Sequence, residues 1–379
     1  MKHTLAFFTS TRSDMTIFEP LLTSIKKNNK FNYQLFVHGT HLEKKYGNTI
    51  NEIKKYNFKI TSKFKTIATP DNFLGQTKTL YNTQKEINNI FNKYKFDAVI
   101  ILGDRVERLP IVSSAIIYRS LIIHIHGGEI TEGALDDQVR HMITKSSHLH
   151  FVICNQYKKN ILRLSEEKFR VHNVGSLGVE KILKTKKKLA GKNKKNNQVI
   201  LTYHPETINN NFKWKKNFSL IIKTLDHFDY NVLITSPGHE KKSLEYIHYI
   251  KKIIKKNKKF KFIESLGGEN YFQELKSSKF VIGNSSSGII EVPYFKIPTI
   301  NIGFRQKGRF LHDSIIQSGC TILNIKKSII KANSENFKKK ISKMKLYFGN
   351  GFTSRKILNI ISKNLKNKHK LLNKKFSIN

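Results

Sequence analysis

Cysteine is scarce in this chain of 379 residues, which contains only Cys154 and Cys320. They lie far apart and show no paired spacing, so neither a disulfide framework nor a cysteine zinc site is supported. Long apolar runs are missing too, because no window approaches the roughly 20 residues of a membrane span. The apolar run at residues 5–8 is too short for a signal peptide and is more typical of a first strand. We therefore expect a cytoplasmic protein without a membrane partner.

Acidic residues and arginine are also scarce. Asp and Glu total 27 against 69 Lys and Arg, which gives a formal net charge of +42, yet only ten of the basic residues are arginine. Specific nucleic-acid modules favour arginine forks or stacked aromatic residues on one face, and the sequence contains neither pattern. The charge therefore favours a solvated lysine-rich surface over a specific nucleic-acid partner. It can still steer an anionic substrate toward the protein.

Short β-branched runs alternate with longer amphipathic stretches, a pattern typical of parallel α/β architecture. A lysine-rich run at residues 181–197 interrupts the alternation and indicates a linker. We expect two Rossmann-like, doubly wound domains at residues 1–180 and 198–379, facing each other across a cleft, with terminal helices from Ser328 onward. Ligands of such sheets bind at the carboxyl ends of strands. The expected strands cover residues 4–8, 33–37, 98–102, 121–125, 149–153, 171–174, 198–203, 231–235, 260–264, 280–282 and 299–302.

Charged residues gather at the expected strand ends between residues 103 and 140. Asp104 and Arg105 follow an apolar run and Gly103, which permits a tight turn. Taken alone, Asp104 is more typical of an N-cap for a helix that begins near Glu107. At the carboxyl end of a parallel strand, it would instead project into the crevice where a substrate binds.

The next expected strand ends in a histidine-rich segment. Alternation places His124 and His126 on one face of the strand, so a metal pair has to be considered. No further ligands stand at a metalloenzyme spacing, which favours histidines that pack in the core or support other residues. Gly127 and Gly128 should bring the backbone close to a neighbouring group and leave Glu129 exposed in a loop.

Two adjacent acids, Asp136 and Asp137, precede Arg140 by helical spacing. Asp136 and Arg140 would be i,i+4 partners on one helix face, which alone indicates a surface salt bridge. An arginine that keeps one carboxylate ionised beside a second one is also a way to keep an acid and a base distinct.

Two loops have the composition of phosphate sites. The loop after the first strand lacks GxGxxG, which disfavours an ordinary nicotinamide site, but it carries Arg12 before a helix N-terminus. A capped helix with a solvated arginine is an equal alternative. The GNSSSG loop at residues 283–288 offers donors to a diphosphate, and Glu291 one turn later suits a ribose diol. A plain serine-rich loop is the alternative there. His204 and His239 follow preceding strands and would line the same cleft.

With these residues in place, the chain resembles the hydrolysing UDP-N-acetylglucosamine 2-epimerases of bacterial sialic acid and legionaminic acid biosynthesis. The resemblance extends from Thr4 to Arg305 through the blocks GDRVE, HIHGGEITEGALDDQVRHMITKSSHLHF, VGSLG, TYHPET and GNSSSGIIEVPYFKIPTINIGFRQKGR. It implies the two-domain fold of GT-B glycosyltransferases, a UDP-sugar substrate, and no metal or redox cofactor. It also implies a homo-oligomer, commonly a dimer or a tetramer.

The motifs and the resemblance together assign candidate site residues. In some relatives an acid stands at the position of His126, so the division of labour between His126 and Glu129 stays open. The catalytic candidates are Asp104, His126, Glu129, Asp136, Asp137, Arg140 and His204. The candidates for binding UDP are Arg12, Arg105, His239, Asn284, Ser285, Ser286, Ser287, Gly288, Glu291 and Arg305.

The implied reaction inverts C2 of a UDP-2-acetamido sugar. A carboxylate removes the C2 proton while UDP leaves C1, water adds to the resulting 2-acetamidoglycal at C1, and a proton returns to C2 from the other face. Two faces need two proton-handling groups, which the carboxylate cluster supplies. The substrate is UDP-N-acetylglucosamine or a UDP-2,4-diacetamido-trideoxyhexose. A GT-B glycosyltransferase would share the fold and the diphosphate loop without needing that cluster, and a nucleic-acid-binding protein rests on charge alone.

Overall fold

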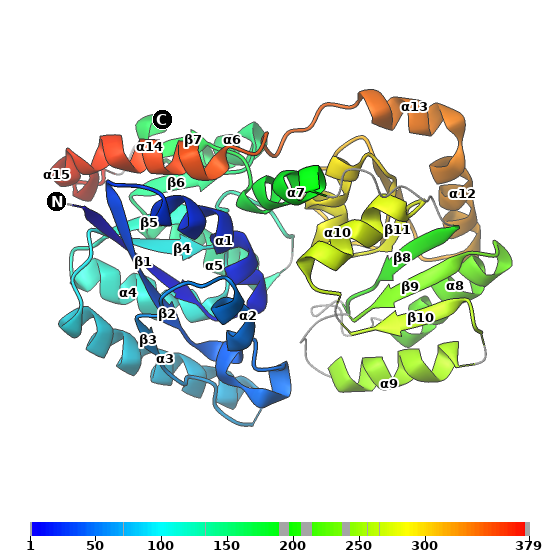
Figure 1. Cartoon of the computed structure of the whole chain (residues 1–379), viewed down its shortest axis with the longest axis horizontal. Coiled ribbons are helices and arrows are strands. Elements are labelled where there is room, and N and C mark those ends of the chain that lie inside the picture. The colour runs from blue at the N-terminus through cyan, green and yellow to red at the C-terminus, as the bar shows by residue number, and fades with distance from the viewer. Residues whose placement is uncertain are drawn as a thin grey trace. The chain divides into compact units, whose positions relative to one another are not determined.

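The computed structural model describes residues 2–70, 72–132, 134–188, 197–205, 214–236, 243–255, 257–264 and 266–375. The chain divides into two compact units (Figure 1). Unit 1 comprises Met1–Glu129, Leu135–Lys181 and Phe348–Asn379, and unit 2 comprises Ile130–Ala134 and Ile182–Tyr347. Each unit contains one parallel β-sheet. Within the described ranges, no helix combines the length and the hydropathy that a bilayer crossing requires.

Unit 1 contains a seven-stranded sheet in the order β3-β2-β1-β4-β5-β6-β7. Its strands are β1 His3–Thr9, β2 Phe31–Val37, β3 Ser62–Lys63, β4 Ala98–Leu102, β5 Leu121–Ile125, β6 Leu149–Val152 and β7 Val171–Asn173. Its helices are α1 Arg12–Lys26, α2 Ile50–Lys55, α3 Phe73–Lys93, α4 Leu109–Ile117, α5 Leu135–Ser146, α6 Asn155–Arg163, the first residues of α7 Leu177–Lys188, α14 Thr353–Leu365 and α15 Lys368–Leu372, with short 3-10 turns η1 Gly39–Leu42, η2 Lys44–Tyr46, η3 Val106–Arg108 and η4 Lys168–Arg170.

Both faces of this sheet are buried, because successive residues of a strand point to opposite sides. In β1, Leu5 and Phe7 belong to one core, whereas Ala6 and Phe8 belong to the other. Helices α1 and α14 cover the first face, and α3, α4 and α5 cover the second. This explains why the strands are nearly continuous apolar runs, such as AVIIL in β4, rather than alternating ones.

Unit 2 contains a six-stranded sheet in the order β10-β9-β8-β11-β12-β13. Its core is formed by the sheet with apolar faces of α8, α9, α12 and α13. The strands are β8 Gln198–Thr202, β9 Asn231–Thr235, β10 Phe260–Ile263, β11 Val281–Gly283, β12 Thr299–Ile302 and β13 Ile315–Ser318. The helices are α8 Trp214–His227, α9 Ser243–Ile254, α10 Gly268–Ser277, α11 Ser286–Ile290, α12 Ile322–Asn333 and α13 Glu335–Lys343, with the 3-10 turn η5 Val292–Phe295.

The strand orders confirm the expected fold class, α/β with two Rossmann-like doubly wound sheets. In both sheets the order reverses once, between β1 and β4 in unit 1 and between β8 and β11 in unit 2. Ligands of such sheets bind outside the carboxyl ends of the strands at this reversal. The loops after β1, β4, β8 and β11 are therefore the expected positions of a ligand-binding site.

Two segments differ from the sequence prediction. Residues 181–188 do not form a linker but continue α7, because Lys181 and Ile182 are buried and the Lys181 ammonium lies 2.9 Å from the hydroxyl of Tyr56. Residues 189–196 lie outside the described residues. The terminal helices α14 and α15 were expected with the second domain, yet they pack on unit 1, where Ile357 and Leu371 join the core beneath α1.

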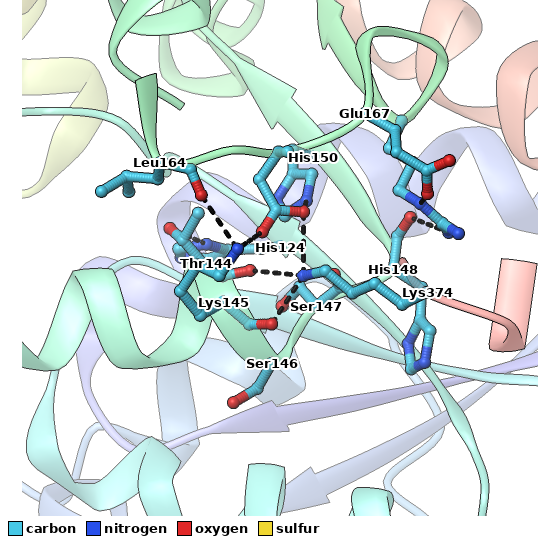
Figure 2. A network of polar contacts seen from close by, with 12 residues as sticks. His124, Thr144, Lys145, Ser146, Ser147, His148, His150, Leu164, Glu167 and Lys374 are labelled. Atoms are coloured by element: carbon cyan, nitrogen blue, oxygen red, sulfur yellow. Dashed lines mark hydrogen bonds and ion pairs between the residues drawn. The ribbon is translucent and has the colours of Figure 1, made fainter. Parts of the chain in front are cut away.

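A buried carboxylate anchors the C-terminal segment to unit 1. Glu166 accepts contacts from Lys145 at 2.9 Å, His150 at 3.1 Å and Lys374 at 2.8 Å, and its side chain is inaccessible to solvent. Lys374 also donates to the carbonyls of Lys145 at 2.6 Å and Ser147 at 2.8 Å, as Figure 2 shows. An ammonium with these partners is well satisfied, so the chain end is held to the C-terminal end of α5 by charge as well as by apolar packing.

We expect Glu166→Gln to lower the free energy of unfolding by about 3 kcal/mol at neutral pH, because it leaves the lysine charges without their buried carboxylate. Burial alone would raise the pKa of Glu166, but hydrogen bonds from His150 and Lys374 lower it to about 2. A carboxyl with a depressed folded-state pKa stabilises the fold above its unfolded pKa and loses this contribution as pH falls through the folded value.

Urea unfolding of both proteins across pH measures this contribution. The stability gap should be constant above the unfolded pKa of 4.5 and should narrow as pH falls from there toward 2. Glu335→Gln is the matched control, since the Glu335–Lys338 pair is exposed, and it should change stability by less than about 0.5 kcal/mol. Equal effects of the two substitutions would contradict the anchoring role.

Candidate active site

Asp104 lies directly after β4, beside the reversal of strand order in unit 1. Gly103 takes φ 69° and donates its amide to the carbonyl of Ile125, which continues the β4–β5 ladder by one residue. The side chain of Asp104 does not cap a helix, because η3 begins after Arg105 and has no side-chain cap. Asp104 instead accepts from Nε of Arg140 at 3.0 Å and also from its Nη2. The helix-cap alternative is therefore wrong for this residue.

Arg140 is the centre of the cluster and is 1% exposed. Its Nη1 donates to Asp137 Oδ1 at 2.5 Å and to the carbonyl of Glu129 at 2.6 Å. The expected i,i+4 pair with Asp136 is replaced by an i,i+3 pair with Asp137. Burial would lower the pKa of Arg140, but the carboxylates of Asp104 and Glu129 raise it, so the guanidinium stays charged. One arginine thus joins the loops after β4 and β5 to helix α5.

Asp136 differs from its neighbour Asp137. It lies exposed in the first turn of α5, and among the described residues it forms no hydrogen bond or ion pair. Partial desolvation and then the charge of Asp104 raise its pKa, although Arg105 and Arg140 oppose this. A helix turns by about 100° per residue, so adjacent aspartates point in different directions. The result is one aspartate bound to Arg140 and one with a free carboxyl group.

His126 and Glu129 form a buried pair after β5. Their Nδ1 and Oε1 atoms are 3.0 Å apart, and the residues are 9% and 5% exposed. Glu129 was expected to be exposed, and this prediction is wrong. Gly128, at φ 76°, carries the loop so close to α6 that a Cβ would lie 2.3 Å from the carbonyl of Tyr157, which buries Glu129. Nε2 of His126 has no hydrogen-bond partner among the described residues.

A second buried arginine, Arg108, supports the loop after β1. It donates to Asp14 at 2.5 Å and to Ser10 Oγ at 3.1 Å. Asp14 also accepts from the amides of Ser10 at 2.9 Å and Thr11 at 3.0 Å, which completes a capping box for α1. Burial would raise the pKa of Asp14, but Arg108 holds it well below its usual range. The sequence reasoning missed both residues; the Thr11–Asp14 capping box was a usable signal for one of them.

The two arginines expected to bind UDP from unit 1 pair with acids of the same unit. Nε of Arg12 lies 3.0 Å from Glu52 of α2, and Arg105 lies 3.2 Å from Glu107. Both side chains are partly exposed, at 34% and 43%. Thr11 is the N-cap of α1, and Arg12 is the first residue of the helix. The loop after β1 therefore ends in a capped helix, as one of the two sequence interpretations predicted.

In unit 2, Asn284 joins the loops on either side of the strand reversal. Its side-chain oxygen lies 2.6 Å from the amide of His204, and its nitrogen donates to the carbonyl of His204 at 2.9 Å. The carbonyl of Asn284 accepts from Arg305 at 3.2 Å and from Gln306 at 2.8 Å. The fully buried Asn284 side chain therefore holds the backbone after β8 against the backbone after β11.

The serine residues of the GNSSSG loop have different roles. Ser285 caps α11 by accepting from the amide of Ser287 at 3.4 Å. Ser287 Oγ donates to Glu291 at 2.6 Å and lies 2.8 Å from the hydroxyl of Tyr271. Gly288 is buried, and a Cβ at this position would lie 2.8 Å from Thr299. Close packing against Thr299 therefore requires glycine here. Ser286 begins α11 and is partly exposed. His239 lies outside the described residues.

Comparison with known proteins identifies the family. Residues 23–362 match the sequence model of the UDP-N-acetylglucosamine 2-epimerase family. The chain belongs to this family. The match covers most of both units, so the resemblance inferred from the sequence motifs is confirmed. The described residues contain no group of three or more His, Cys, Asp or Glu side chains that could hold a metal ion.

Individual relatives support the same family assignment. The chain is 35% identical over 350 residues to the GDP/UDP-N,N'-diacetylbacillosamine 2-epimerase (hydrolyzing) of Campylobacter jejuni, covering 89% of both chains. It is 33% identical over 322 residues to the polysialic acid biosynthesis protein P7 of Escherichia coli, covering 82% of this chain and 81% of that protein. The name of the first relative favours a 2-epimerase over a GT-B glycosyltransferase.

A solved structure shares the fold. The Neisseria meningitidis UDP-GlcNAc 2-epimerase, solved bound to UDP-GlcNAc, superposes with a TM-score of 0.82 at 17% identity. The superposition covers 96% of this chain and 100% of the other. At this identity the likeness concerns the fold, and it agrees with the two doubly wound sheets of the 2-epimerase described above.

The Asp14–Arg108 pair generates a test of the unit 1 scaffold. Asp14→Asn and Arg108→Met should each lower the free energy of unfolding by about 3–5 kcal/mol, because each leaves one buried charge without its partner. The double substitution should lose clearly less than the sum. A thermodynamic cycle from urea unfolding measures the coupling. Additive losses would show that the two side chains do not stabilise each other.

Proposed function

We propose that the chain is a hydrolysing 2-epimerase that converts a UDP-2-acetamido sugar into the free C2 epimer and UDP. The observation that carries the proposal is the cluster around Arg140, which gathers Asp104, Asp137 and the Glu129 carbonyl at the carboxyl ends of β4 and β5. Asp136 adds an unpaired carboxyl group beside it. Family membership and the named activities of the relatives support the same reaction.

The chemistry follows from the needs of the C2 proton. A general base takes the C2 proton while the C1–O bond to UDP breaks, which leaves a 2-acetamidoglycal. Water then adds its oxygen to C1, and a general acid returns a proton to the opposite face of C2. Overall one water is consumed, and UDP and the free sugar are released. Each positioned acid or base contributes roughly 10²–10⁴ in rate.

Asp104 and Asp136 are proposed as the two proton-handling groups. Asp104 is held by Arg140, whereas Asp136 has a raised pKa and no hydrogen-bonded partner among the described residues. Two carboxyl groups in different environments are the usual means of separating an acid from a base. Asp137 would keep Arg140 in place, and the buried His126–Glu129 pair would shape the wall of the sugar site.

UDP is proposed to bind at the strand reversal of unit 2, and the notion that Arg12 and Arg105 of unit 1 also contact it stays a prediction from the sequence. Amides at the start of α11 and Arg305 would hold the diphosphate, with Ser285 and Ser286 as further donors. Glu291, which accepts a hydrogen bond from Ser287, would also accept hydrogen bonds from the ribose hydroxyls. His204, His239, Ser287 and Gly288 complete the proposed site, and a homo-oligomer, either dimer or tetramer, is part of the proposal.

The substrate is proposed to be UDP-N-acetylglucosamine or a UDP-2,4-diacetamido-trideoxyhexose. Relatives named for the second substrate class occur in Campylobacter jejuni at 35% identity and in Legionella pneumophila at 27% identity. A relative named UDP-N-acetylglucosamine 2-epimerase, from Neisseria meningitidis, is 29% identical. Both substrates share the 2-acetamido group and the UDP leaving group on which the mechanism depends.

Proton NMR with each nucleotide sugar in D2O tests the reaction and the substrate together. We expect release of UDP and of a free mannosamine-type sugar that carries deuterium at C2, because the returning proton comes from a solvent-exchanged acid. The substrate that turns over identifies the sugar. Retained protium at C2, or consumption only after a sugar acceptor is added, would indicate a glycosyltransferase and refute the epimerase.

Asp104→Asn tests the proton-transfer cluster. The amide can still accept a hydrogen bond from Arg140 but cannot take the C2 proton, so kcat should fall by about 10²–10⁴ while the Kd for UDP stays within a factor of two. The rate of UDP release measures kcat, and calorimetry measures the Kd for UDP. Asp313→Asn, in an exposed pair with Lys340, is the control. A normal kcat in Asp104→Asn would mean that the residue only supports the loop.

A further inference from the structure

His124 connects two parts of the proposed epimerase site without belonging to it. It is the fourth residue of β5 and has no solvent exposure. One ring nitrogen, Nε2, lies 2.8 Å from the carbonyl of Gly103, the residue before Asp104. The other, Nδ1, lies 3.2 Å from the hydroxyl of Thr144 on α5. A single imidazole therefore bridges the Asp104 turn and the helix that carries Asp136 and Arg140.

The chemistry of the partners determines the tautomer of His124. A carbonyl can only accept a hydrogen bond, so Nε2 must carry the hydrogen that it donates to Gly103. A neutral imidazole then has a lone pair on Nδ1, which accepts from the hydroxyl of Thr144. Desolvation lowers the pKa of His124 to about 3, so the ring is neutral at physiological pH. Both ring nitrogens are then satisfied.

Simple packing does not account for a histidine at this position. Its neighbours Ile123 and Ile125 are buried apolar residues of the same strand, and an aliphatic side chain would avoid the desolvation of two ring nitrogens. The space is also closed on the side of the next loop, since a Cβ on Gly127 would lie 2.8 Å from Nδ1. The ring lies between the Gly103 turn, the Gly127 loop and α5, and it forms hydrogen bonds to the first and the last of these.

Helix α5 is fixed at the end opposite to its acidic residues. Lys374 donates to the carbonyls of Lys145 and Ser147 at 2.6 Å and 2.8 Å, and Figure 2 shows these contacts beside Thr144 and His124. Thr144 is therefore part of a well-anchored turn. Thr144 fixes the His124 ring by one hydrogen bond, and the ring fixes the carbonyl of Gly103 by a second.

We propose that His124 and Thr144 are positioning residues, which set the Asp104 turn at a fixed distance from the acids of α5. The inference rests on the proposed epimerase reaction, in which Asp104 and Asp136 act on opposite faces of one carbon. A displacement of about 1 Å at such a site can lower the rate roughly 10²-fold. Arg140 holds the Asp104 carboxylate, while His124 holds its backbone.

Thr144→Val tests the proposal because it removes the hydroxyl and keeps the shape. We expect kcat to fall about tenfold while KM stays within a factor of two, since the UDP contacts are untouched. Thr144→Ser keeps the hydroxyl and should restore kcat to within a factor of two. Should Thr144→Val not fold, Thr144→Ala, which removes the same hydroxyl without placing a second methyl group beside the ring, is measured in its place.

Ser147→Ala is the matched control. The Ser147 hydroxyl is buried next to the C-terminal end of α5 and donates to the carbonyl of Ile143 at 2.7 Å, without touching His124. It should lower the melting temperature as Thr144→Val does, but leave kcat unchanged. Equal losses of kcat in both variants would reduce His124 and Thr144 to general packing and overturn the proposal.

A readout independent of activity separates this inference from the epimerase reaction. In protein labelled with ¹⁵N-glycine, the amide resonance of Gly103, assigned by its loss in Gly103→Asn, should shift in Thr144→Val and not in Ser147→Ala. An unmoved Gly103 resonance in Thr144→Val overturns the positioning role whatever the activity. Absence of turnover in the wild-type protein with both nucleotide sugars, together with a shifted resonance, refutes the reaction and leaves the coupling intact.

Discussion

The buried guanidinium of Arg140 is the constraint on which the candidate site of unit 1 depends. A charge that is 1% exposed requires partners in every direction. It finds them in Asp104 after β4, in the Glu129 carbonyl after β5 and in Asp137 on its own helix. These contacts determine where each loop lies relative to α5. They also leave Asp136 unpaired, so that the same constraint that holds the loops separates two adjacent aspartates.

The same physical requirement recurs in two other parts of unit 1. Asp14 and Arg108 satisfy each other beneath the loop after β1, and Glu166 with Lys374 holds the chain end at the C-terminal end of α5. Each ion pair joins segments that are distant in sequence, and each is buried enough that loss of one partner would leave a charge without solvent. Buried ion pairs therefore help to place the loops of unit 1. The amide of Asn284 does the corresponding work in unit 2, where a neutral group holds two backbones together.

Local sequence pattern predicted the elements of the fold better than the details of the site. The runs AVIIL and LIIHI lie at β4 and β5 within the expected bounds, because strands buried on both faces are nearly pure apolar sequence. The choice of Asp137 over Asp136 as partner of Arg140 depends on where α5 begins, which composition does not specify. The Asp14–Arg108 pair spans 94 residues and has no local signature. The docking of α14 on unit 1 depends on which of two apolar faces is left uncovered, and the helix sequence does not contain that information.

Half of the arginines of this lysine-rich chain lie at the candidate site loops. Only ten of 69 basic residues are arginine, yet Arg12, Arg105, Arg108, Arg140 and Arg305 all lie in or beneath the candidate site loops. Lysine suffices for a solvated surface, where a charge needs only water. A buried contact to several carboxylates and carbonyls needs a planar group with five donors and a permanent charge. Arg140, which uses Nε, Nη1 and Nη2 at once, could not be replaced by a lysine without losing contacts to at least one loop. The buried arginines Arg108 and Arg140 thus lie where the loops of unit 1 need a charge with several directed donors.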